Sequence, residues 1–184
     1  VADIGCGFGT STIIMAKEFP NSQFTGYDFH PDSIRHAQEH AREMGLTNVE
    51  FKTSAVKEIA ERDFELVTIF DALHDMGDPV GAARHVRETL KPGGTLMLVE
   101  PMAGDTLADN LNPVGRVYYA FSTSVCVPAS LNQEVGAALG AQAVHQHAHR
   151  GLAAVVGVLV GRADQAAEAD DGRDVPVPAR AETR

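Results

Sequence analysis

Hydrophobic and polar positions along residues 1–100 follow two alternating patterns, and each pattern predicts a different kind of element. Short apolar runs bounded by Gly, Pro or Asp predict strands, whereas apolar residues three or four positions apart predict helices. The predicted strands are residues 1–4, 23–28, 49–52, 64–70 and 95–100. The predicted helices are residues 10–19, 31–44 and 79–90. This alternation favours an α/β fold with a doubly wound, mostly parallel sheet and helices on both faces.

The buried faces of these elements can also be predicted. The apolar stripe of the second helix is Ile34, Ala37, Ala41 and Met44. Gly45 follows that helix and suits its C-terminal cap. The apolar stripe of the third helix is Val80, Ala83, Val86 and Leu90. The run "KPGG" predicts a turn before the fifth strand.

The pattern changes after Pro101, where aromatic and polar residues are mixed. Residues 112–128 predict a helix, and a further helix is expected from Ser130. Tyr118, Tyr119 and Phe121 either form an aromatic lid or pack in the core, and the usual burial of aromatic side chains favours the core. We therefore expect residues 104–143 to form a lid region belonging to the domain of residues 1–143.

Residues 144–184 differ in composition from the rest of the chain. They consist of Ala, Val, Gly, Arg, Asp, Glu, Pro, His, Gln and Leu with one Thr, and after residue 161 they contain almost no large apolar residue. We expect an atypical, partly disordered tail. Such a composition is typical of an alternate reading frame in GC-rich DNA, so the hypothesis is that a frameshift ends the family-like sequence near Ala143. His145, His147 and His149 alternate in sequence as metal ligands can. A coincidental spacing of solvent-exposed histidines explains the pattern better.

Composition and charge exclude several classes of protein. The 184 residues allow one sizeable core, and a net charge of -10 argues against a broad phosphate-binding surface. Cys6 and Cys126 form neither a disulfide framework nor a metal-binding pattern. We therefore expect a cytoplasmic protein with no metal site and no nucleic-acid partner. The longest apolar run, residues 151–161, is too short to span a bilayer, so no membrane partner is expected.

A glycine-rich loop, "VADIGCGFGTS", opens the chain directly after the first strand. Gly5, Gly7 and Gly9 form a G-x-G-x-G run, whereas dinucleotide enzymes space theirs as G-x-G-x-x-G, so a nicotinamide oxidoreductase is disfavoured. Glycines at this turn allow a sharp bend and close approach of a ligand to a helix N-terminus. Asp3 can hold the loop or reach a ligand through water, and Asp28, at the end of the second strand, can accept both hydroxyls of a ribose. The alternative is a tight turn without a ligand.

Four segments in order resemble class I S-adenosylmethionine-dependent methyltransferases. They are "VADIGCGFGTS", "FTGYDFHPDSI", "FELVTIFDALHD" and "LKPGGTLMLVEP". Residues 112–143 also resemble the lid of a bacterial subgroup that carries a winged-helix-like domain before the Rossmann-like domain. The resemblance implies that this N-terminal domain is missing from the truncated chain, and a homodimer is expected to form through the missing domain. It also implies a sixth strand and an antiparallel seventh beside the fifth. No convincing pair follows residue 143, although residues 151–160 can supply one weak strand. We therefore expect a sheet incomplete at both ends, with the fifth strand as an unpaired edge.

The resemblance also assigns positions to a site for the cofactor S-adenosylmethionine. Asp3, Gly5, Gly7 and Gly9 would line its methionine moiety, with Cys6 inside the same loop as a small apolar residue. Asp28 would bind the ribose, and Phe29 would flank the adenine. Ser54 and Ala55 stand where the family commonly has Asp-Ala against the adenine amino group, and this departure weakens the expected contact. Phe70 and Asp71 would close the site after the fourth strand.

The implied reaction moves a methyl group from S-adenosylmethionine to a small-molecule acceptor, with oxygen as the candidate atom. A hydroxyl acceptor must lose a proton, for which a histidine with a near-neutral pKa is suited. "ALHDMGDP" resembles a stretch in small-molecule O-methyltransferases, in which the histidine is the general base, so His74 is the catalytic candidate. Met76 replaces the usual Trp, and Glu100 is the one visible carboxylate partner. The alternative is a loop histidine without a catalytic part.

Nucleic-acid methylation is disfavoured by two motifs. Amino-directed enzymes carry an Asn/Asp-Pro-Pro-aromatic run after the fourth strand, where this chain has "DALH". Cytosine C5 enzymes need a Pro-Cys motif, which the sequence lacks. A second interpretation of the whole chain is a catalytically incompetent fragment or a ligand-sensing regulator module that binds S-adenosylmethionine.

Overall fold

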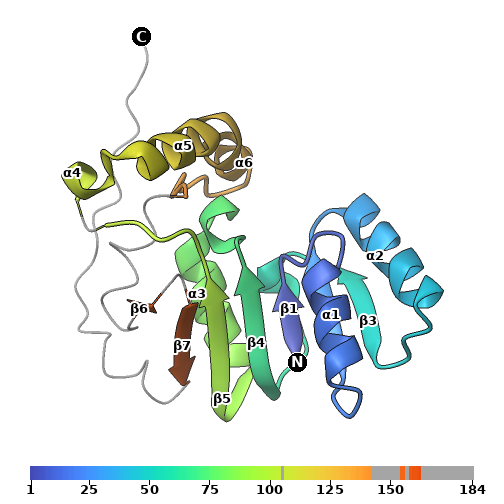
Figure 1. Cartoon of the computed structure of the whole chain (residues 1–184). Coiled ribbons are helices and arrows are strands. Elements are labelled where there is room, and N and C mark those ends of the chain that lie inside the picture. The colour runs from blue at the N-terminus through green and yellow to red at the C-terminus, as the bar shows by residue number, and fades with distance from the viewer. Residues whose placement is uncertain (105, 142–153, 156–157, 163–184) are drawn as a thin grey trace.

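The computed structural model describes residues 1–104, 106–141, 154–155 and 158–162, which contain a seven-stranded sheet of order β3-β2-β1-β4-β5-β7-β6 (Figure 1). The strands are β1 (Ala2–Ile4), β2 (Phe24–Asp28), β3 (Val49–Thr53), β4 (Phe64–Phe70), β5 (Leu90–Val99), β6 (Ala154–Val155) and β7 (Val158–Arg162). Strands β1 to β5 pair in parallel, and β7 pairs antiparallel with both β5 and β6. The predicted Rossmann-like, mostly parallel α/β sheet is confirmed.

The helices connect these strands and cover both faces of the sheet. They are α1 (Thr10–Glu18), α2 (Pro31–Glu43), α3 (Pro79–Thr89), α4 (Leu107–Asn110), α5 (Pro113–Phe121) and α6 (Val127–Leu131). Two single turns of 3-10 helix are η1 (Val56–Glu58) and η2 (Leu73–Asp75), and a π-helical turn, η3 (Ser122–Cys126), joins α5 to α6. Helices α1 and α3 lie on opposite faces of the sheet (Figure 1), as the doubly wound prediction requires.

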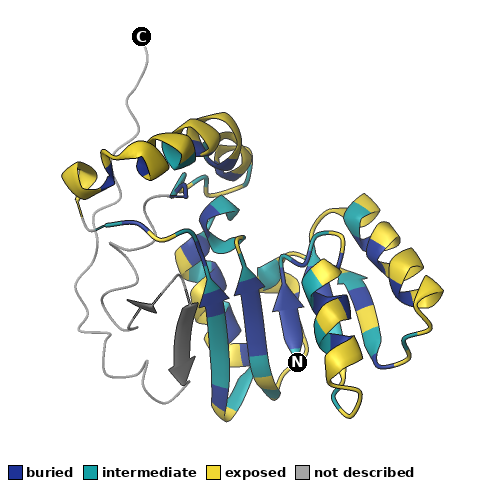
Figure 2. Ribbon diagram, viewed as in Figure 1, coloured by how far each residue is buried: buried dark blue, intermediate teal, exposed yellow. Residues whose placement is uncertain are grey.

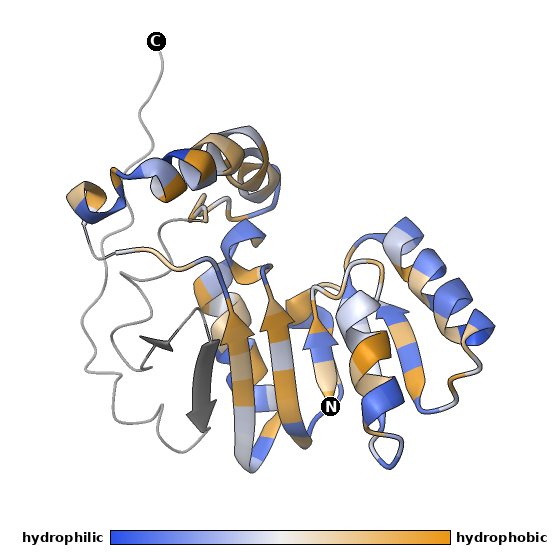
Figure 3. Ribbon diagram, in the orientation of Figure 1, coloured by the Kyte–Doolittle hydropathy of each residue, from blue (hydrophilic) through white to orange (hydrophobic). Residues whose placement is uncertain are grey.

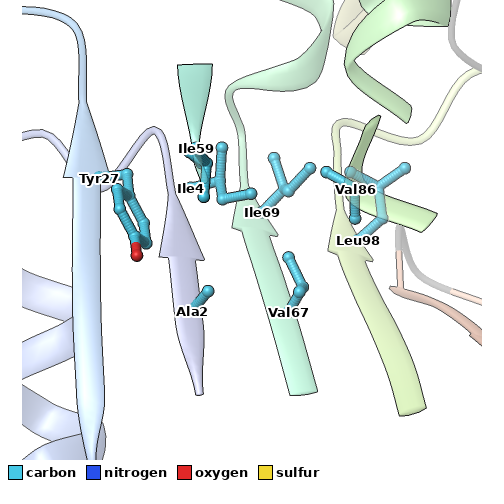
Figure 4. Close-up of a cluster of buried hydrophobic side chains, with 8 residues drawn as sticks. All are labelled: Ala2, Ile4, Tyr27, Ile59, Val67, Ile69, Val86 and Leu98. Carbon is cyan, nitrogen blue, oxygen red and sulfur yellow. The ribbon is translucent and has the colours of Figure 1, made fainter. Parts of the chain in front are cut away.

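Two clusters of buried apolar side chains form the core. The larger cluster comprises Ala2, Ile4, Tyr27, Ile59, Val67, Ile69, Val86 and Leu98 (Figure 4). The second cluster comprises Cys6, Ile13, Ile34, Ala37, Ala41 and Phe51, contributed by the glycine loop, α1, α2 and β3. Hydrophobic residues line the central strands β4 and β5, whereas α2 is largely hydrophilic on the outside (Figure 3). The site described below therefore stands on a packed sheet.

Two predicted helix faces need correction. Val80 is 61% exposed and Ala83 is also exposed, whereas α3 buries Ala82, Val86 and Thr89. The buried residues recur at i, i+4 and i+7, and Val80 lies well away from that stripe because each residue turns the helix by about 100°. In α2 the predicted stripe is confirmed except at Met44, which caps the end of the helix and is 42% exposed.

The predicted turn at "KPGG" is present inside β5. Phe64 pairs with Leu90 while Leu66 pairs with Thr95. Four residues of β5, 91–94, therefore lie opposite a single residue of β4, Glu65. Gly93 adopts φ +76°, a left-handed conformation that favours glycine. The strand therefore begins earlier than residue 95, with a bulge where the turn is expected.

The expectation that the fifth strand would be an unpaired edge is wrong. Residues Val158–Arg162 form β7 and pair antiparallel with β5 from Val99↔Val158 to Thr95↔Arg162. Residues 151–160, expected to supply one weak strand and no pair, instead contain β6 and most of β7, which pair with each other and end at Arg162. The predicted boundary at residues 143–144, the alternating histidines and the tail beyond residue 162 lie outside the described residues.

The lid helices α4, α5 and α6 lie beyond the carboxyl ends of β4 and β5 (Figure 1). The helix predicted over residues 112–128 is confirmed, whereas the helix predicted from Ser130 is wrong. Gly136, Ala138 and Gly140 have φ between 53° and 72°, so this segment forms turns instead.

The lid helices bury small residues and expose large apolar ones. Gly115, Ser122, Cys126 and Ser130 face inward. Phe121 is 63% exposed, so the prediction that this side chain packs in the core is wrong, while Tyr118 and Tyr119 are half-buried. Exposed positions predominate along the ribbon of the lid helices (Figure 2). None of the helices in the described ranges is long and apolar enough to cross a membrane.

Candidate cofactor site and catalytic histidine

The three glycines of the first loop serve different purposes. Gly5, Gly7 and Gly9 have φ of 71°, 54° and 76°, which side chains rarely adopt. A Cβ on Gly5 would lie 2.6 Å from the Cβ of Ala72, and one on Gly9 would lie 2.7 Å from Ala37 and the Phe51 ring. A Cβ on Gly7 would meet no described atom within 4 Å. Gly5 and Gly9 therefore allow tight packing, while Gly7 leaves the loop open.

The end of β2 holds this loop in place. The backbone N–H groups of Gly5 and Cys6 both donate to the Tyr27 carbonyl, at 2.8 and 3.0 Å. The N–H of Gly7 donates to Asp28 Oδ2 at 2.9 Å, and the N–H of His30 donates to Asp28 Oδ1 at 2.8 Å. The structure therefore brings Asp28 and the glycine loop, two parts of the predicted cofactor site, into contact. That Asp28 binds a ribose stays a prediction.

Asp3 lies beneath the loop. Its carboxylate is only 1% exposed and accepts hydrogen bonds from three hydroxyl groups. The donors are Ser11 at 2.7 Å, Thr12 at 2.6 Å and Thr68 at 2.8 Å. Burial raises the pKa of Asp3 above its usual value, against the lowering effect of these hydrogen bonds. Asp3 thus joins β4 to the first turn of α1, which follows the glycine loop, and its role toward a ligand stays a prediction. The sequence analysis missed the three hydroxyl partners, although Ser11 and Thr12 lie just after the glycines.

Cys6 is part of the second hydrophobic cluster rather than the open side of the loop. Its side chain is buried, and burial raises the pKa of the thiol, with the charges of Asp3 and Asp28 acting in the same direction. The Cys6 thiol therefore serves as a small core group, and only its backbone belongs to the predicted cofactor loop.

The predicted adenine-side residues follow β2 and β3. Phe29 is exposed immediately after Asp28. Ser54 follows β3, and its N–H donates to the Asp28 carbonyl at 2.9 Å. The Ser54 hydroxyl donates to the carbonyl of its exposed neighbour Ala55 at 3.0 Å. These residues gather at the carboxyl ends of adjacent parallel strands, where ligands bind in open α/β sheets.

Phe70 and Asp71 stand at the carboxyl end of β4. Phe70 is half-buried. Asp71 has φ 53°, an uncommon conformation for a residue other than glycine, and its N–H donates to the Val99 carbonyl at 2.7 Å. Its exposed carboxylate lies 3.9 Å from Nδ1 of His74. A residue held in this conformation at a strand end is typical of functional sites.

His74 lies in η2 and is 3% exposed. Its Nδ1 and Oε2 of Glu100 form a hydrogen bond, and the other oxygen of Glu100 accepts from the Leu73 N–H at 2.8 Å. Glu100 follows β5, so two neighbouring strands bring this pair together. On the other side of the ring, Asp75 Oδ1 lies 3.3 Å from Nε2. Glu100 is confirmed as a partner of His74, whereas the contact with Asp75 was not predicted.

These carboxylates determine the electrostatics of the imidazole. Burial disfavours the charged ring, but the hydrogen bond and charge of Glu100, together with the charges of Asp75 and Asp71, raise the pKa of His74 above its usual value. Cys126 of η3 also approaches, because His74, Asp75 and Cys126 have polar atoms within 4.8 Å of one another. A cation could fit this spacing, and a protonated imidazole satisfies the same acidic groups without one.

A family model supports what the geometry indicates. The model described as "Methyltransferase domain" matches residues 1–147. Curated relatives include a ubiquinone biosynthesis O-methyltransferase of Paracidovorax citrulli, 32% identical over 51% of this chain and 40% of the relative. Another is a demethylmenaquinone methyltransferase of Listeria welshimeri, 31% identical over 66% of this chain and 50% of the relative. The chain thus spans half or less of the length of these relatives.

Solved structures show the same architecture. The YcgJ protein of Bacillus subtilis has a TM-score of 0.56 and 25% identity, covering 70% of this chain and 52% of that chain. The [4+2]-cyclase SpnF has a TM-score of 0.51 and 30% identity, covering 56% of this chain and 40% of that chain. Together with the family model, the strand order and the glycine loop show that this chain belongs to the methyltransferase-domain family, in the class I S-adenosylmethionine-dependent group.

Proposed function

We propose that this domain binds S-adenosylmethionine at the carboxyl ends of β1 and β2 and methylates a hydroxyl oxygen of a small molecule. The observation that carries the proposal is the contact between the two halves of the site. Gly5 of the cofactor loop approaches Ala72, which stands two residues before the buried His74–Glu100 pair. A ligand lying on the loop would therefore be close to a candidate general base. The relative that is an O-methyltransferase supports oxygen as the acceptor atom.

The loop residues fit the proposed cofactor. The open space at Gly7 allows a ligand to approach the backbone closely. Among the described side chains, none caps the first turn of α1, so its N–H groups can attract a carboxylate. The carboxylate of Asp28 can accept hydroxyl groups of a ribose. When bound, S-adenosylmethionine supplies an activated methyl group, and this chain has to orient an acceptor toward it.

His74 would act as the base through Nε2. With Nδ1–H donating to Glu100, the Nε2 lone pair is the one that can accept a proton from a hydroxyl. The imidazolium formed would be stabilised by Glu100 and Asp75. Asp75 Oδ1 lies 3.3 Å from Nε2, so this carboxylate oxygen and the acceptor hydroxyl would approach the same ring nitrogen. Because the pKa of His74 is raised above its usual value, a higher pH is needed before most of the His74 side chains are in the unprotonated form that can act as a base.

Calorimetric titration tests cofactor binding first. We expect S-adenosylmethionine and S-adenosylhomocysteine to bind, and NAD to serve as a non-binding control. Asp28→Ala should weaken binding about 10- to 150-fold, the equivalent of one charge-assisted hydrogen bond. Asp32→Ala, which removes an exposed carboxylate on α2, is the matched control and should bind normally. A folded wild-type chain that fails to bind S-adenosylmethionine would contradict the proposal.

Transfer of a labelled methyl group to a panel of hydroxylated aromatic acceptors tests the reaction. We expect His74→Gln to lower kcat by about 10²- to 10⁴-fold, the contribution of a general base. His40→Gln changes an exposed histidine of α2 and should leave kcat unchanged. Cofactor binding without turnover on any acceptor would favour the alternative, a ligand-sensing module or an inactive fragment.

We also propose a cytoplasmic location, which the free thiols of Cys6 and Cys126 support.

A further inference from the structure

The turn that follows His74 is held by side chains from the lid. Gln133 Nε2 donates to the Asp75 carbonyl at 2.7 Å, and the Gly77 N–H donates to Gln133 Oε1 at 2.8 Å. The Ser130 hydroxyl donates to the Met76 carbonyl at 2.9 Å. More than fifty residues of sequence separate the partners in each of these bonds. The lid therefore contacts the histidine turn through specific polar bonds.

The lid bonds four of the six polar backbone groups of residues 75–77. The other two, the N–H groups of Asp75 and Met76, donate to the Ala72 and Leu73 carbonyls of the same segment at 3.2 Å each. The Ala137 N–H donates to the Gly77 carbonyl at 2.8 Å, so Gly77 is held through both its polar backbone groups. Ser130, which is fully buried, accepts in turn from the Ala138 N–H at 3.0 Å. Buried polar groups that are satisfied in this way lose a partner, at a cost in free energy, if either side moves.

Close packing accompanies these hydrogen bonds. A Cβ added at Gly77 would lie 2.5 Å from the Cβ of Gln133. Cys126 and Ser130 are four residues apart and lie near one face of the lid helix, and Gln133 follows two residues after the end of α6. Cys126 reaches the Asp75 side chain, and Gln133 reaches the Asp75 backbone. Asp75 is thus contacted by the lid at both its side chain and its main chain.

We propose that Gln133 is a positioning residue for His74, because its amide clamps the backbone on both sides of Met76 and so fixes the Asp75 carboxylate against Nε2. This inference rests on the proposed function for its catalytic consequence. Among the residues that the structure describes, the titratable groups that face the imidazole are Glu100 after β5, Asp71 and Asp75 from its own segment, and Cys126 from the lid. Of these three carboxylate residues, Asp75 is the one whose backbone accepts a hydrogen bond from Gln133. Its loss is expected to weaken one of three charge contacts with the ring.

The test is a Gln133→Met variant of the whole chain, which approximately keeps the volume of the side chain. It removes the two hydrogen bonds of Gln133 to the turn, together with one to the Ala129 carbonyl at 3.2 Å. Gln38→Met is the matched control, because Gln38 Nε2 also donates to a backbone carbonyl, that of Phe51, at 3.0 Å. NMR titration of the His74 ring in the cofactor-free chain gives a readout that needs no activity. We expect the His74 pKa to fall by about one pH unit in Gln133→Met, the lower end of the effect of a carboxylate at 4–6 Å. Gln38→Met should titrate like the wild type.

Enzyme kinetics test the catalytic consequence. We expect kcat to fall roughly 10- to 100-fold in Gln133→Met with the KM for S-adenosylmethionine unchanged, because the base is displaced while the cofactor loop is intact. Gly77→Ala pushes Gln133 away without altering it and should show the same changes, which covers the case in which Gln133→Met fails to fold. Amide exchange at residue 77 reports whether each variant releases the turn.

The outcomes separate the two proposals. If amide exchange shows the turn released while His74 titrates as in the wild type, the positioning role is overturned. A shifted titration with unchanged kcat would overturn its catalytic consequence. If the wild type transfers no methyl group to any acceptor, the proposed function fails, and the NMR titration still decides whether Gln133 positions Asp75 and His74.

Discussion

Replacing Gly9 with alanine tests whether this glycine is required for folding rather than for binding. Gly9 has φ +76° at the N-cap of α1, and a Cβ there would lie 2.7 Å from both Ala37 and the Phe51 ring. The left-handed conformation costs an alanine about 1–2 kcal/mol. The overlap costs about 1–3 kcal/mol more, because α2 and β3 must shift to relieve it. We therefore expect Gly9→Ala to lower the free energy of unfolding by about 2–5 kcal/mol.

Gly7→Ala is the matched comparison. Gly7 also has a positive φ, +54°, but a Cβ there would meet no described atom within 4 Å. Only the conformational cost of about 1–2 kcal/mol is expected in the free chain. The same methyl group would project into the space where we propose that the cofactor approaches the loop. Gly7→Ala should therefore weaken S-adenosylmethionine binding more than it weakens the fold.

Thermal unfolding and calorimetry together check this pair of variants. For a chain of this size, about 2–4 °C of Tm is lost per kcal/mol, so Gly9→Ala should lower Tm by about 4–20 °C and Gly7→Ala by about 2–8 °C. Equal stability losses in the two variants, or a cofactor affinity unaffected by Gly7→Ala, would refute the division of roles between the glycines. The first result would show that packing around Gly9 relaxes without cost.

Three further predictions concern the supports of the site and the core. Asp3→Ala should lower the free energy of unfolding by about 1–3 kcal/mol or more, since it leaves buried hydroxyl donors without their acceptor, and urea denaturation measures this. Because the folded pKa of His74 is raised, its stabilising contribution is complete below about pH 6.5 and is lost as the pH rises through the raised value. Unfolding measured across that range should show a larger loss in the wild type than in Glu100→Gln, which keeps the charges of Asp71 and Asp75. Ile69→Ala should cost about 2–5 kcal/mol, whereas Val80→Ala on the exposed side of α3 should change stability by less than about 0.5 kcal/mol, and equal losses would contradict the burial assignment.

The sequence predicted the elements of residues 1–100 well because their signals are local. An apolar run such as residues 64–70 predicts a buried strand without any knowledge of its neighbours. Pro31 and Gly45 indicate the start and the end of a helix through their own backbone preferences. The lid was predicted less well. Its helix exposes Phe121 and buries Ser122, Cys126 and Ser130, so the usual link between hydrophobicity and burial pointed to the wrong face. Polar bonds to the histidine turn, which sequence periodicity does not reveal, orient this helix.

The sequence by itself determined the strand and helix types, the left-handed glycine loop and the placement of Asp28 and His74 at strand ends. These features depend on period, on backbone freedom and on the rule that parallel strands end at one edge. Tertiary structure alone decided which groups meet there: Asp3 with three hydroxyls, His74 with Glu100 and Asp75, Gln133 with the turn of residues 75–77, and β7 beside β5. Each of these contacts joins residues from different elements, except Asp75, which follows His74 in sequence. Their partners are set by strand order and register, which depend on the packing of the whole sheet.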